Sequence, residues 1–129
     1  MPPRDVVIDT NFFLIPYQFK IDIITELEHL VDVHHRLVMT SKTLTELEKL
    51  AMNEGKKGAG ARLAIKIIDV NFDHFEIIDS NRPVDRWILE YAVENGAIVC
   101  TNDKELKKKL KENGIKVISL RGKTKIDYV

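Results

Sequence analysis

The feature that most constrains the fold is a regular alternation of short β-branched runs with longer segments of helical periodicity. The first run, Val6-Val7-Ile8, is apolar and stops at Asp9-Thr10-Asn11, residue types that favour turns and helix caps. Such a run predicts a buried strand. Downstream, apolar residues recur at the spacing of an amphipathic helix, at Ile21, Ile24, Leu27, Leu30 and Val31. The chain therefore begins as a strand followed by a helix.

The same alternation continues to the last residues. Leu37-Val38-Met39 predicts a second strand, and Ser41 or Thr43 can cap a helix carrying Leu44, Leu47, Leu50 and Ala51. Glycines at both ends of the stretch 55–60 predict a loop. The remaining expected segments are helices at 63–70, 83–95 and 103–113 and strands at 75–78, 97–100 and 117–120, the last of the chain.

Strands that alternate with helices of about ten or more residues predict right-handed crossovers and a mostly parallel sheet with helices on both faces. The expected fold class is therefore α/β, as a three-layer α/β/α sandwich. With 129 residues, 44% of them hydrophobic, we expect one domain over 1–129 with a real core. A single cysteine, Cys100, and the lack of a signal-type or membrane-spanning apolar run predict a soluble cytoplasmic protein.

Charge is unevenly distributed although the net charge is zero. Residues 104–129 hold nine basic and three acidic residues, a net charge of +6, so the other 103 residues carry −6. A basic end joined to an acidic remainder is expected where one surface contacts a polyanion and another collects cations. A solvated lysine-rich helix explains the basic end equally well.

Four acidic residues follow the expected strands or lie in the first turns of the following helices, where open α/β sheets bind ligands. They are Asp9, Glu46, Asp85 and Asp103. Any one of them can simply cap a helix, and Asn102 with Glu105 can form a capping box. Together, however, several carboxylates repel one another unless a divalent metal is bound, and oxygen-only ligands favour Mg²⁺ or Mn²⁺ over zinc.

These residues resemble a known family, the PIN domain of metal-dependent ribonucleases. The motifs that carry the resemblance are Asp9-Thr-Asn, Glu46-Leu47, Asp85 ahead of Trp-Ile-Leu, and Thr101-Asn-Asp103, in the order and rough spacing of the family. The strings Thr45-Glu-Leu-Glu-Lys-Leu50 and Thr101-Asn-Asp-Lys-Glu-Leu-Lys-Lys109 look most similar to the small archaeal and eukaryotic branch that processes ribosomal RNA. Toxin nucleases of the VapC type are the other near relatives.

The resemblance implies an endoribonuclease in which Asp9, Glu46, Asp85 and Asp103 hold Mg²⁺ or Mn²⁺ and form the catalytic centre. Thr10, Asn11 and Thr101 would support these acids. The choice of Glu46 over Glu48 comes from the resemblance, because both lie at the edges of one apolar helix stripe, on opposite sides. The resemblance further implies that the RNA is cut to leave a 5′-phosphate and a 3′-hydroxyl. It also implies that the protein forms a homodimer and that it binds an antitoxin or a ribosome-assembly partner.

Basic residues near the end of the chain would hold RNA backbone phosphates under this interpretation. They are Lys104, Lys107, Lys108, Arg121, Lys123 and Lys125. The lysines of the stretch 55–60 can also meet phosphate, although that stretch lacks the Gly-Lys-Ser/Thr ending of a P-loop.

Other function classes fit less well. The histidines are not spaced as a zinc site, and Cys100 is expected in the core rather than as a nucleophile. Trp87 and Tyr91 predict packing at a core edge or subunit contact, with stacking on an RNA base as the alternative. A receiver domain would need adjacent acids after the first strand, and a dehalogenase-type phosphatase a second aspartate in place of Asn11. A non-cleaving RNA-binding or assembly module with the same fold stays open.

Overall fold

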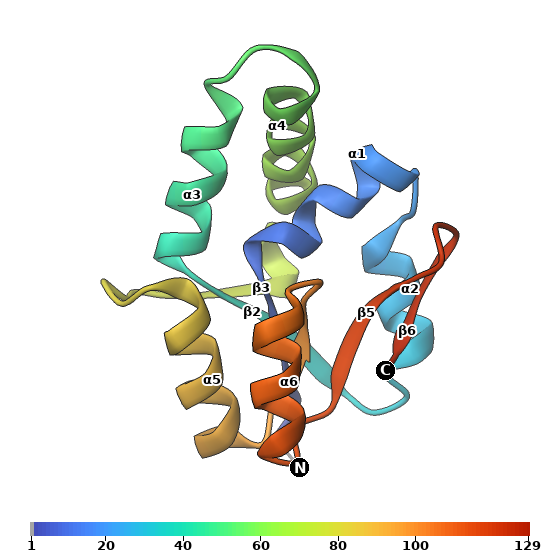
Figure 1. Cartoon of the computed structure of the whole chain (residues 1–129), viewed down its shortest axis with the longest axis vertical. Coiled ribbons are helices and arrows are strands. Elements are labelled where there is room, and N and C mark those ends of the chain that lie inside the picture. The colour runs from blue at the N-terminus through green and yellow to red at the C-terminus, as the bar shows by residue number, and fades with distance from the viewer. Residues whose placement is uncertain (1) are drawn as a thin grey trace.

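A computed structural model describes residues 2–129 of the chain (Figure 1). The strands are β1 Arg4–Ile8, β2 His35–Thr40, β3 Phe75–Ile78, β4 Ile98–Cys100, β5 Val117–Arg121 and β6 Lys125–Tyr128. The α-helices are α1 Ile15–Phe19, α2 Ile23–Leu30, α3 Ser41–Ala51, α4 Gly55–Val70, α5 Val84–Asn95 and α6 Lys104–Glu112. Two short 3₁₀ helices, η1 Thr10–Leu14 and η2 Phe72–His74, complete the fold.

The strands form one sheet in the order β3-β2-β1-β4-β5-β6. All neighbours are parallel except β5 and β6, which are antiparallel. The chain moves outward from β1 to β2 and β3, then crosses to β4 on the other side of β1. The sheet therefore reverses its winding direction at β1, and in open α/β sheets such a switch point opens a crevice at the carboxyl ends of the strands.

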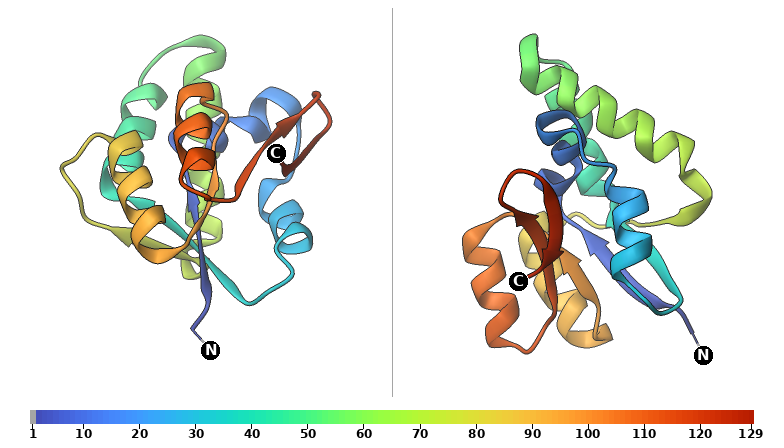
Figure 2. Two further views of the ribbon diagram at one scale, coloured as in Figure 1. Left: turned by 60° about the horizontal axis from the view of Figure 1, so that its bottom comes forward. Right: turned by 90° about the vertical axis from the view of Figure 1, so that its right-hand side faces the viewer.

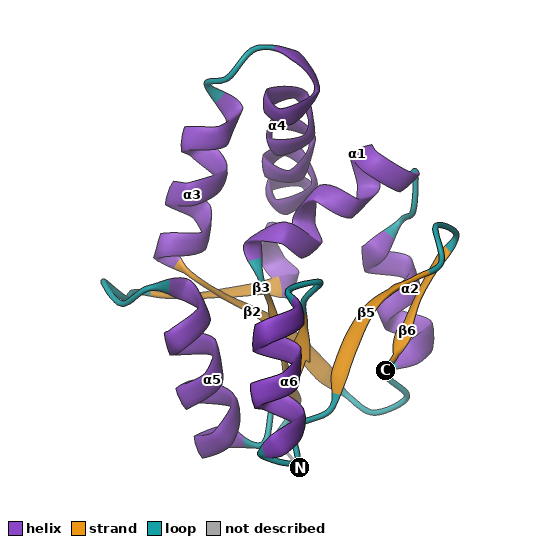
Figure 3. Ribbon diagram, in the orientation of Figure 1, coloured by secondary structure: helices purple, strands orange, loops and turns teal. Residues whose placement is uncertain are grey.

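Helices cover both faces of this sheet, which confirms the α/β sandwich (Figures 2 and 3). The side chains of Val6, Ile8 and Met39 point to one face and pack with η1, α1, α2, α3 and α4. Val7 and Val99 point to the other face and pack with α5 and α6. This alternation of neighbouring residues between faces is the period of two expected for a strand that is buried on both sides. No helix within residues 2–129 is both long and apolar enough to cross a membrane.

The glycine-rich stretch is a helix, so the loop predicted at 55–60 is wrong. It forms the first turns of α4, and one of its glycines is explained by a close contact. A Cβ on Gly58 would lie 1.7 Å from the backbone oxygen of Asn53, whereas one on Gly60 would meet the ring of Tyr17 at 3.5 Å, an ordinary van der Waals contact. Glycine composition predicted a flexible segment, but at position 58 the missing side chain lets α4 pass close to Asn53.

Two other expectations needed correction. The strand at 117–120 is not the last, because Gly122, at a φ of +60°, lets the chain turn back into β6. The sequence after β5 gave little hint of this hairpin, since β6 has only four residues and only one of them, Ile126, is fully buried. The helix expected from Ile21 is present as α2, but it is preceded by η1 and α1, which the sequence did not predict, and Lys20 is in a left-handed conformation at the end of α1.

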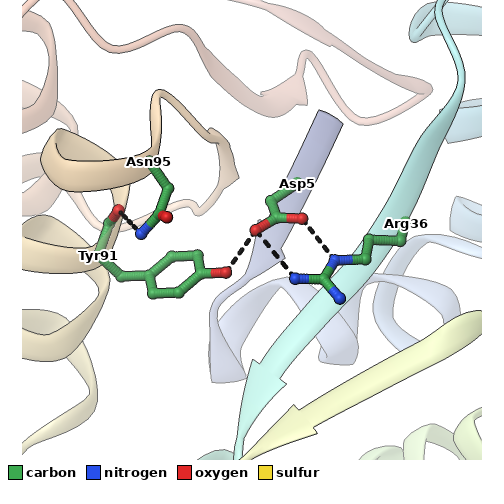
Figure 4. A network of polar contacts seen from close by, with 4 residues as sticks. All are labelled: Asp5, Arg36, Tyr91 and Asn95. Atoms are coloured by element: carbon green, nitrogen blue, oxygen red, sulfur yellow. Dashed lines mark hydrogen bonds and ion pairs between the residues drawn. The ribbon is translucent and has the colours of Figure 1, made fainter. Parts of the chain in front are cut away.

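A polar network joins helix α5 to strands β1 and β2 (Figure 4). Asp5 on β1 accepts hydrogen bonds from Arg36, its cross-strand neighbour on β2, and from the hydroxyl of Tyr91 on α5. Burial raises the pKa of Asp5, but the hydrogen bonds from Arg36 and Tyr91 outweigh it and hold that pKa below its ordinary value. Asn95 donates to the carbonyl of Tyr91 one turn earlier in the helix.

Candidate functional site

The four predicted acids line one open cavity of about 380 Å³ at the switch point of the sheet. β1 delivers the first acid, α3 and α5 carry two more in their early turns, and the fourth follows β4. The cavity is lined by Asp9, Thr10, Asn11, Lys42, Glu46, Pro83, Val84, Asp85 and Asp103. Segments that are up to 94 residues apart in the chain therefore meet because parallel strands end at one edge of the sheet.

Asp9 is the most enclosed of the four, with 7% of its surface exposed. Its Oδ2 accepts hydrogen bonds from Thr101 Oγ1 at 2.7 Å and Asn11 Nδ2 at 3.1 Å, and its Oδ1 accepts one from the Thr10 amide at 2.9 Å. Burial raises the pKa of Asp9, the Thr101 and Thr10 hydrogen bonds oppose this, and the nearby carboxylates of Asp103 and Glu46 raise it further. Ionised Asp9 is thus held in place against repulsion from its neighbours.

Glu46 faces the cavity and Glu48 does not. Glu46 Oε1 accepts a hydrogen bond from Thr10 Oγ1 at 2.5 Å, whereas Glu48 is exposed and lies outside the lining. Helical spacing alone left these two open. The position of α3 beside η1 distinguishes them, because it turns one edge of the apolar stripe toward β1.

Lys42 is a cavity residue that the sequence patterns did not single out. It lies in the first turn of α3, four residues before Glu46, so the two side chains share one face of the helix. It is the only basic residue among those lining this cavity. The spacing of four between a lysine and a candidate acid was the available signal.

Asp103 and Asp85 are exposed at the rim, and each is also bound to its own helix. Asp103 is the N-cap of α6 and accepts from the Leu106 amide at 2.8 Å, while Asp85 accepts from the Arg86 amide at 2.9 Å. The capping box expected from Asn102 with Glu105 is therefore wrong, because the cap is one residue later. Asp103 therefore both caps α6 and lines the acidic cavity.

Asn102 instead ties the cavity to β5. Its amide donates to Asn11 Oδ1 at 3.0 Å, and its own side-chain oxygen accepts from Ser119 Oγ and the Leu120 amide, both at 2.9 Å. Asn11 in turn donates to Asp9. The turn after β4 is consequently rigid, and Thr101 Oγ1 adds to it by accepting from the Asp103 amide at 3.1 Å. Thr10, Asn11 and Thr101 thus lie where supporting residues were expected.

The acidic set fits a divalent cation in the kind of atoms it offers. All four candidate ligands are carboxylates, the donors preferred by Mg²⁺ and Mn²⁺. Within residues 2–129, however, no three histidine, cysteine, aspartate or glutamate side chains are placed to hold a metal ion together. Glu46, Asp85 and Asp103 each direct one carboxylate oxygen toward a local hydrogen-bond donor.

The six basic residues predicted to bind RNA lie outside the cavity lining. Arg121 and Lys125 flank Asp127 in the β5–β6 hairpin, at 3.9 and 3.6 Å, and Lys107 donates to Ser119 Oγ at 3.4 Å. Lys104, Lys108 and Lys123 are exposed. The contacts of Arg121 and Lys125 with Asp127 neutralise part of the charge of the hairpin.

Two remaining sequence interpretations are confirmed by burial. Cys100 is fully buried, and burial raises the pKa of its thiol, which keeps it protonated and unreactive. Trp87 is 8% exposed and stacks on Tyr91 with ring centroids 4.5 Å apart, so the pair packs at the edge of the core.

Comparisons with known proteins agree with this geometry. The family described as PIN like domain matches residues 6–123. The chain is 37% identical to Ribonuclease VapC9 of Archaeoglobus fulgidus, over 88% of this chain and 81% of the relative, and 37% identical to Ribonuclease VapC4 of Methanocaldococcus jannaschii, over 92% and 91%.

Two further matches are an rRNA-processing protein and a PIN domain endonuclease. The rRNA-processing protein fcf1 of Schizosaccharomyces pombe is 30% identical over 92% of this chain, which spans 60% of that protein. The solved structure of the PIN domain endonuclease Utp24 superposes with a TM-score of 0.80 at 28% identity, covering 99% of this chain and 92% of that one.

Proposed function

Because the chain belongs to the PIN-like domain family, we propose that it is a metal-dependent endoribonuclease whose centre consists of Asp9, Glu46, Asp85 and Asp103. The observation that carries the proposal is the convergence of these acids on one cavity at the switch point of the sheet. Two relatives of similar length are named ribonucleases, which supports RNA as the substrate. The cut would be hydrolytic and leave a 5′-phosphate and a 3′-hydroxyl.

The four carboxylates would hold Mg²⁺ or Mn²⁺. When bound, such an ion supplies Lewis-acid activation of the attacking water and neutralises charge on the phosphate. The protein contributes position. Both oxygens of Asp9 are held by hydrogen bonds from Thr101, Asn11 and the Thr10 amide. Little further ordering of this carboxylate would therefore be needed for it to bind a metal ion.

The negative charge of the cavity also has to be balanced when RNA binds. Unneutralised carboxylates in the cavity would repel the RNA phosphate, and Lys42 is the lining residue that can offset this. We assign Lys42 to holding a non-bridging phosphate oxygen beside the acids. Asp85 and Asp103, which are exposed, can leave their local amide bonds at low cost when a cation arrives.

The decisive test compares Glu46→Gln with Glu48→Gln, the same change two residues apart on one helix. Cleavage of a structured RNA is measured with Mn²⁺, with Mg²⁺ and with chelator, and Mn²⁺ affinity is measured separately by calorimetry. We expect Glu46→Gln to lose Mn²⁺ affinity and at least about 100-fold in cleavage, because about 100-fold is already the upper cost of losing a residue that only orients a metal ligand, while Glu48→Gln behaves as wild type. Equal behaviour of the two variants would contradict the assignment.

A biological role in ribosomal RNA processing is our further proposal, supported by the match to fcf1 and by the superposition on Utp24. A toxin role with an antitoxin partner is the second candidate, favoured by the 37% identity to two VapC ribonucleases. Expression of the free protein separates them. Growth arrest that depends on Asp9 supports the toxin, and normal growth with an altered ribosomal RNA precursor supports processing and a ribosome-assembly partner.

A non-cleaving RNA-binding module would bind RNA without cutting it in any metal. We also propose that the protein forms a homodimer, as the resemblance implies. Sedimentation over micromolar concentrations checks this, and a single species of monomer mass would count against it.

A further inference from the structure

A second cavity lies between α1 and the first turns of α4, and it differs in charge from the acidic one. It encloses about 730 Å³ and is lined by Pro16, Tyr17, Gln18, Lys20, Lys56, Lys57 and Leu63. Every ionisable group in this lining other than the tyrosine is a lysine. We name it the α1–α4 groove.

The three groove lysines are free of carboxylate partners. The ion pairs within residues 2–129 use Arg36, Arg82, Arg121 and Lys125, and none uses a groove lysine. Lys56 and Lys57 also lie in the first turn of α4, where the helix dipole disfavours cations. The acidic residue beside them is Glu54, the N-cap of α4, and its side chain makes no capping hydrogen bond. Because the dipole does not favour these two lysines at this end of the helix, their charge is available to an anionic ligand.

Tyr17 adds an aromatic surface beside these cations. Its ring rests on Gly60, and 39% of the residue is exposed. Lysines next to an exposed aromatic ring are the combination that binds single-stranded nucleic acid, with phosphates on the cations and a base on the ring.

The groove is linked to the acidic cavity by continuous helical backbone. Leu14 and Ile15, at the join of η1 and α1, both have right-handed helical angles, so the segment from Asp9 to Tyr17 is not broken. At about 2.0 Å per 3₁₀ residue and about 1.5 Å per α residue, Tyr17 lies about 14 Å along this segment from Asp9. Figure 1 shows η1 and α1 leading away from the end of β1 toward α4.

We propose that the α1–α4 groove binds single-stranded RNA of the substrate, to one side of the cleaved bond. A strand stacked as in a duplex advances about 3.4 Å per nucleotide and an extended single strand advances further, so a path of about 14 Å corresponds to at most about four nucleotides. The proposal rests on the proposed function, because it assigns the groove to the strand that the acidic centre cuts. An acidic protein segment would meet the same lysines, but the continuity with the acidic cavity favours the substrate strand.

The test measures binding of a labelled single-stranded RNA of about 12 nucleotides by fluorescence anisotropy, in chelator so that no cutting occurs. The Lys56→Gln/Lys57→Gln variant is compared with Lys111→Gln/Lys116→Gln, which removes equal charge from exposed positions outside the groove. Two lost phosphate contacts should lower the slope of log affinity against log salt by about 1.4 in the groove variant. The control variant should keep the wild-type slope.

The stacking contact is tested at Tyr17. We expect Tyr17→Leu to weaken RNA binding by about fivefold to 150-fold, the range for loss of one stacked base, and Tyr17→Phe to bind as wild type. Thermal melting of both variants checks that the fold is intact. Equal loss in both variants would assign the effect to the hydroxyl group and overturn the stacking role.

The outcomes separate this proposal from the nuclease itself. If the protein cuts RNA but the groove and control variants have equal salt slopes, the groove proposal is wrong and the nuclease stands. If the wild type never cuts but the groove variant alone loses RNA affinity, the groove stands without the nuclease. If a poly-glutamate peptide binds wild type but not the groove variant, and the RNA slope is unchanged, the groove belongs to an acidic protein partner.

Discussion

The hydroxyl of Thr101 offers the sharpest single-atom test of how the acidic centre is held. Thr101 is fully buried, donates to Asp9 Oδ2 at 2.7 Å and accepts from the Asp103 amide at 3.1 Å. Thr101→Val keeps the shape of the side chain and removes both hydrogen bonds. A bond to a charged group contributes about 1.5–3 kcal/mol, and an amide left without a partner costs about 1–3 kcal/mol.

We therefore expect Thr101→Val to lower the free energy of unfolding by about 3 kcal/mol, the lower part of that combined range because the Asp103 amide is only partly buried. For 129 residues at about 2.1 cal/mol/K of unfolding entropy per residue, the melting temperature should fall by about 11 °C. Burial already raises the pKa of Asp9, and losing the Thr101 hydrogen bond raises this pKa further. The acid limb of the cleavage rate should move to higher pH.

The measurements are thermal melting in chelator and the cleavage rate as a function of pH. Thr43→Val is the matched control, since Thr43 is also buried but its hydroxyl meets Thr40, 3.3 Å away, and no acid. The control should leave the acid limb in place. If Thr101→Val melts with wild type and its pH profile is unmoved, the hydroxyl does not hold Asp9 and the reasoning fails.

Asp9→Asn tests the raised pKa of Asp9 through stability. The folded protein binds the carboxyl proton of Asp9 more tightly than the unfolded chain does, so in chelator the wild-type free energy of unfolding should fall relative to that of the variant as pH rises above 3.8. Urea unfolding at several pH values checks this, and a constant difference between the two proteins would refute the raised pKa. Gly58→Ala should destabilise the protein strongly, because the new Cβ would lie 1.7 Å from the backbone oxygen of Asn53. Gly60→Ala should be neutral or stabilise by up to about 1 kcal/mol, because alanine favours a helix over glycine and its Cβ would meet Tyr17 at an ordinary 3.5 Å. The reverse order of melting temperatures would contradict the helical assignment. Tyr91→Phe removes a hydrogen bond to Asp5 and should cost about 1–2 kcal/mol at pH 7. Because the pKa of Asp5 is lowered in the folded state, that cost should shrink as pH falls below 3.8, which unfolding at low pH checks.

Some of the site was determined by local sequence. A β-branched run stopping at Asp9 specifies a buried strand that ends in a polar turn, and the run before Thr101 does the same. Since parallel strands end at one edge of a sheet, these two positions had to be close once the alternation of strands and helices was recognised. The fold class and the convergence of the acids were predictable for this reason.

The rest depended on how the helices are rotated and where chain segments meet. The apolar stripe of α3 fixes which side of the helix is buried but not which of its two edges faces η1. Periodicity therefore could not separate Glu46 from Glu48, and only packing showed that Glu46 and Lys42 line the cavity. Gly58 is required because α4 passes close to the backbone of Asn53, a contact that no local pattern reveals. Local spacing determines which face of a helix or strand is apolar. Which residues of other segments lie beside the polar edges of that element is determined by long-range packing. The α1–α4 groove exists only because that packing places the two helices side by side.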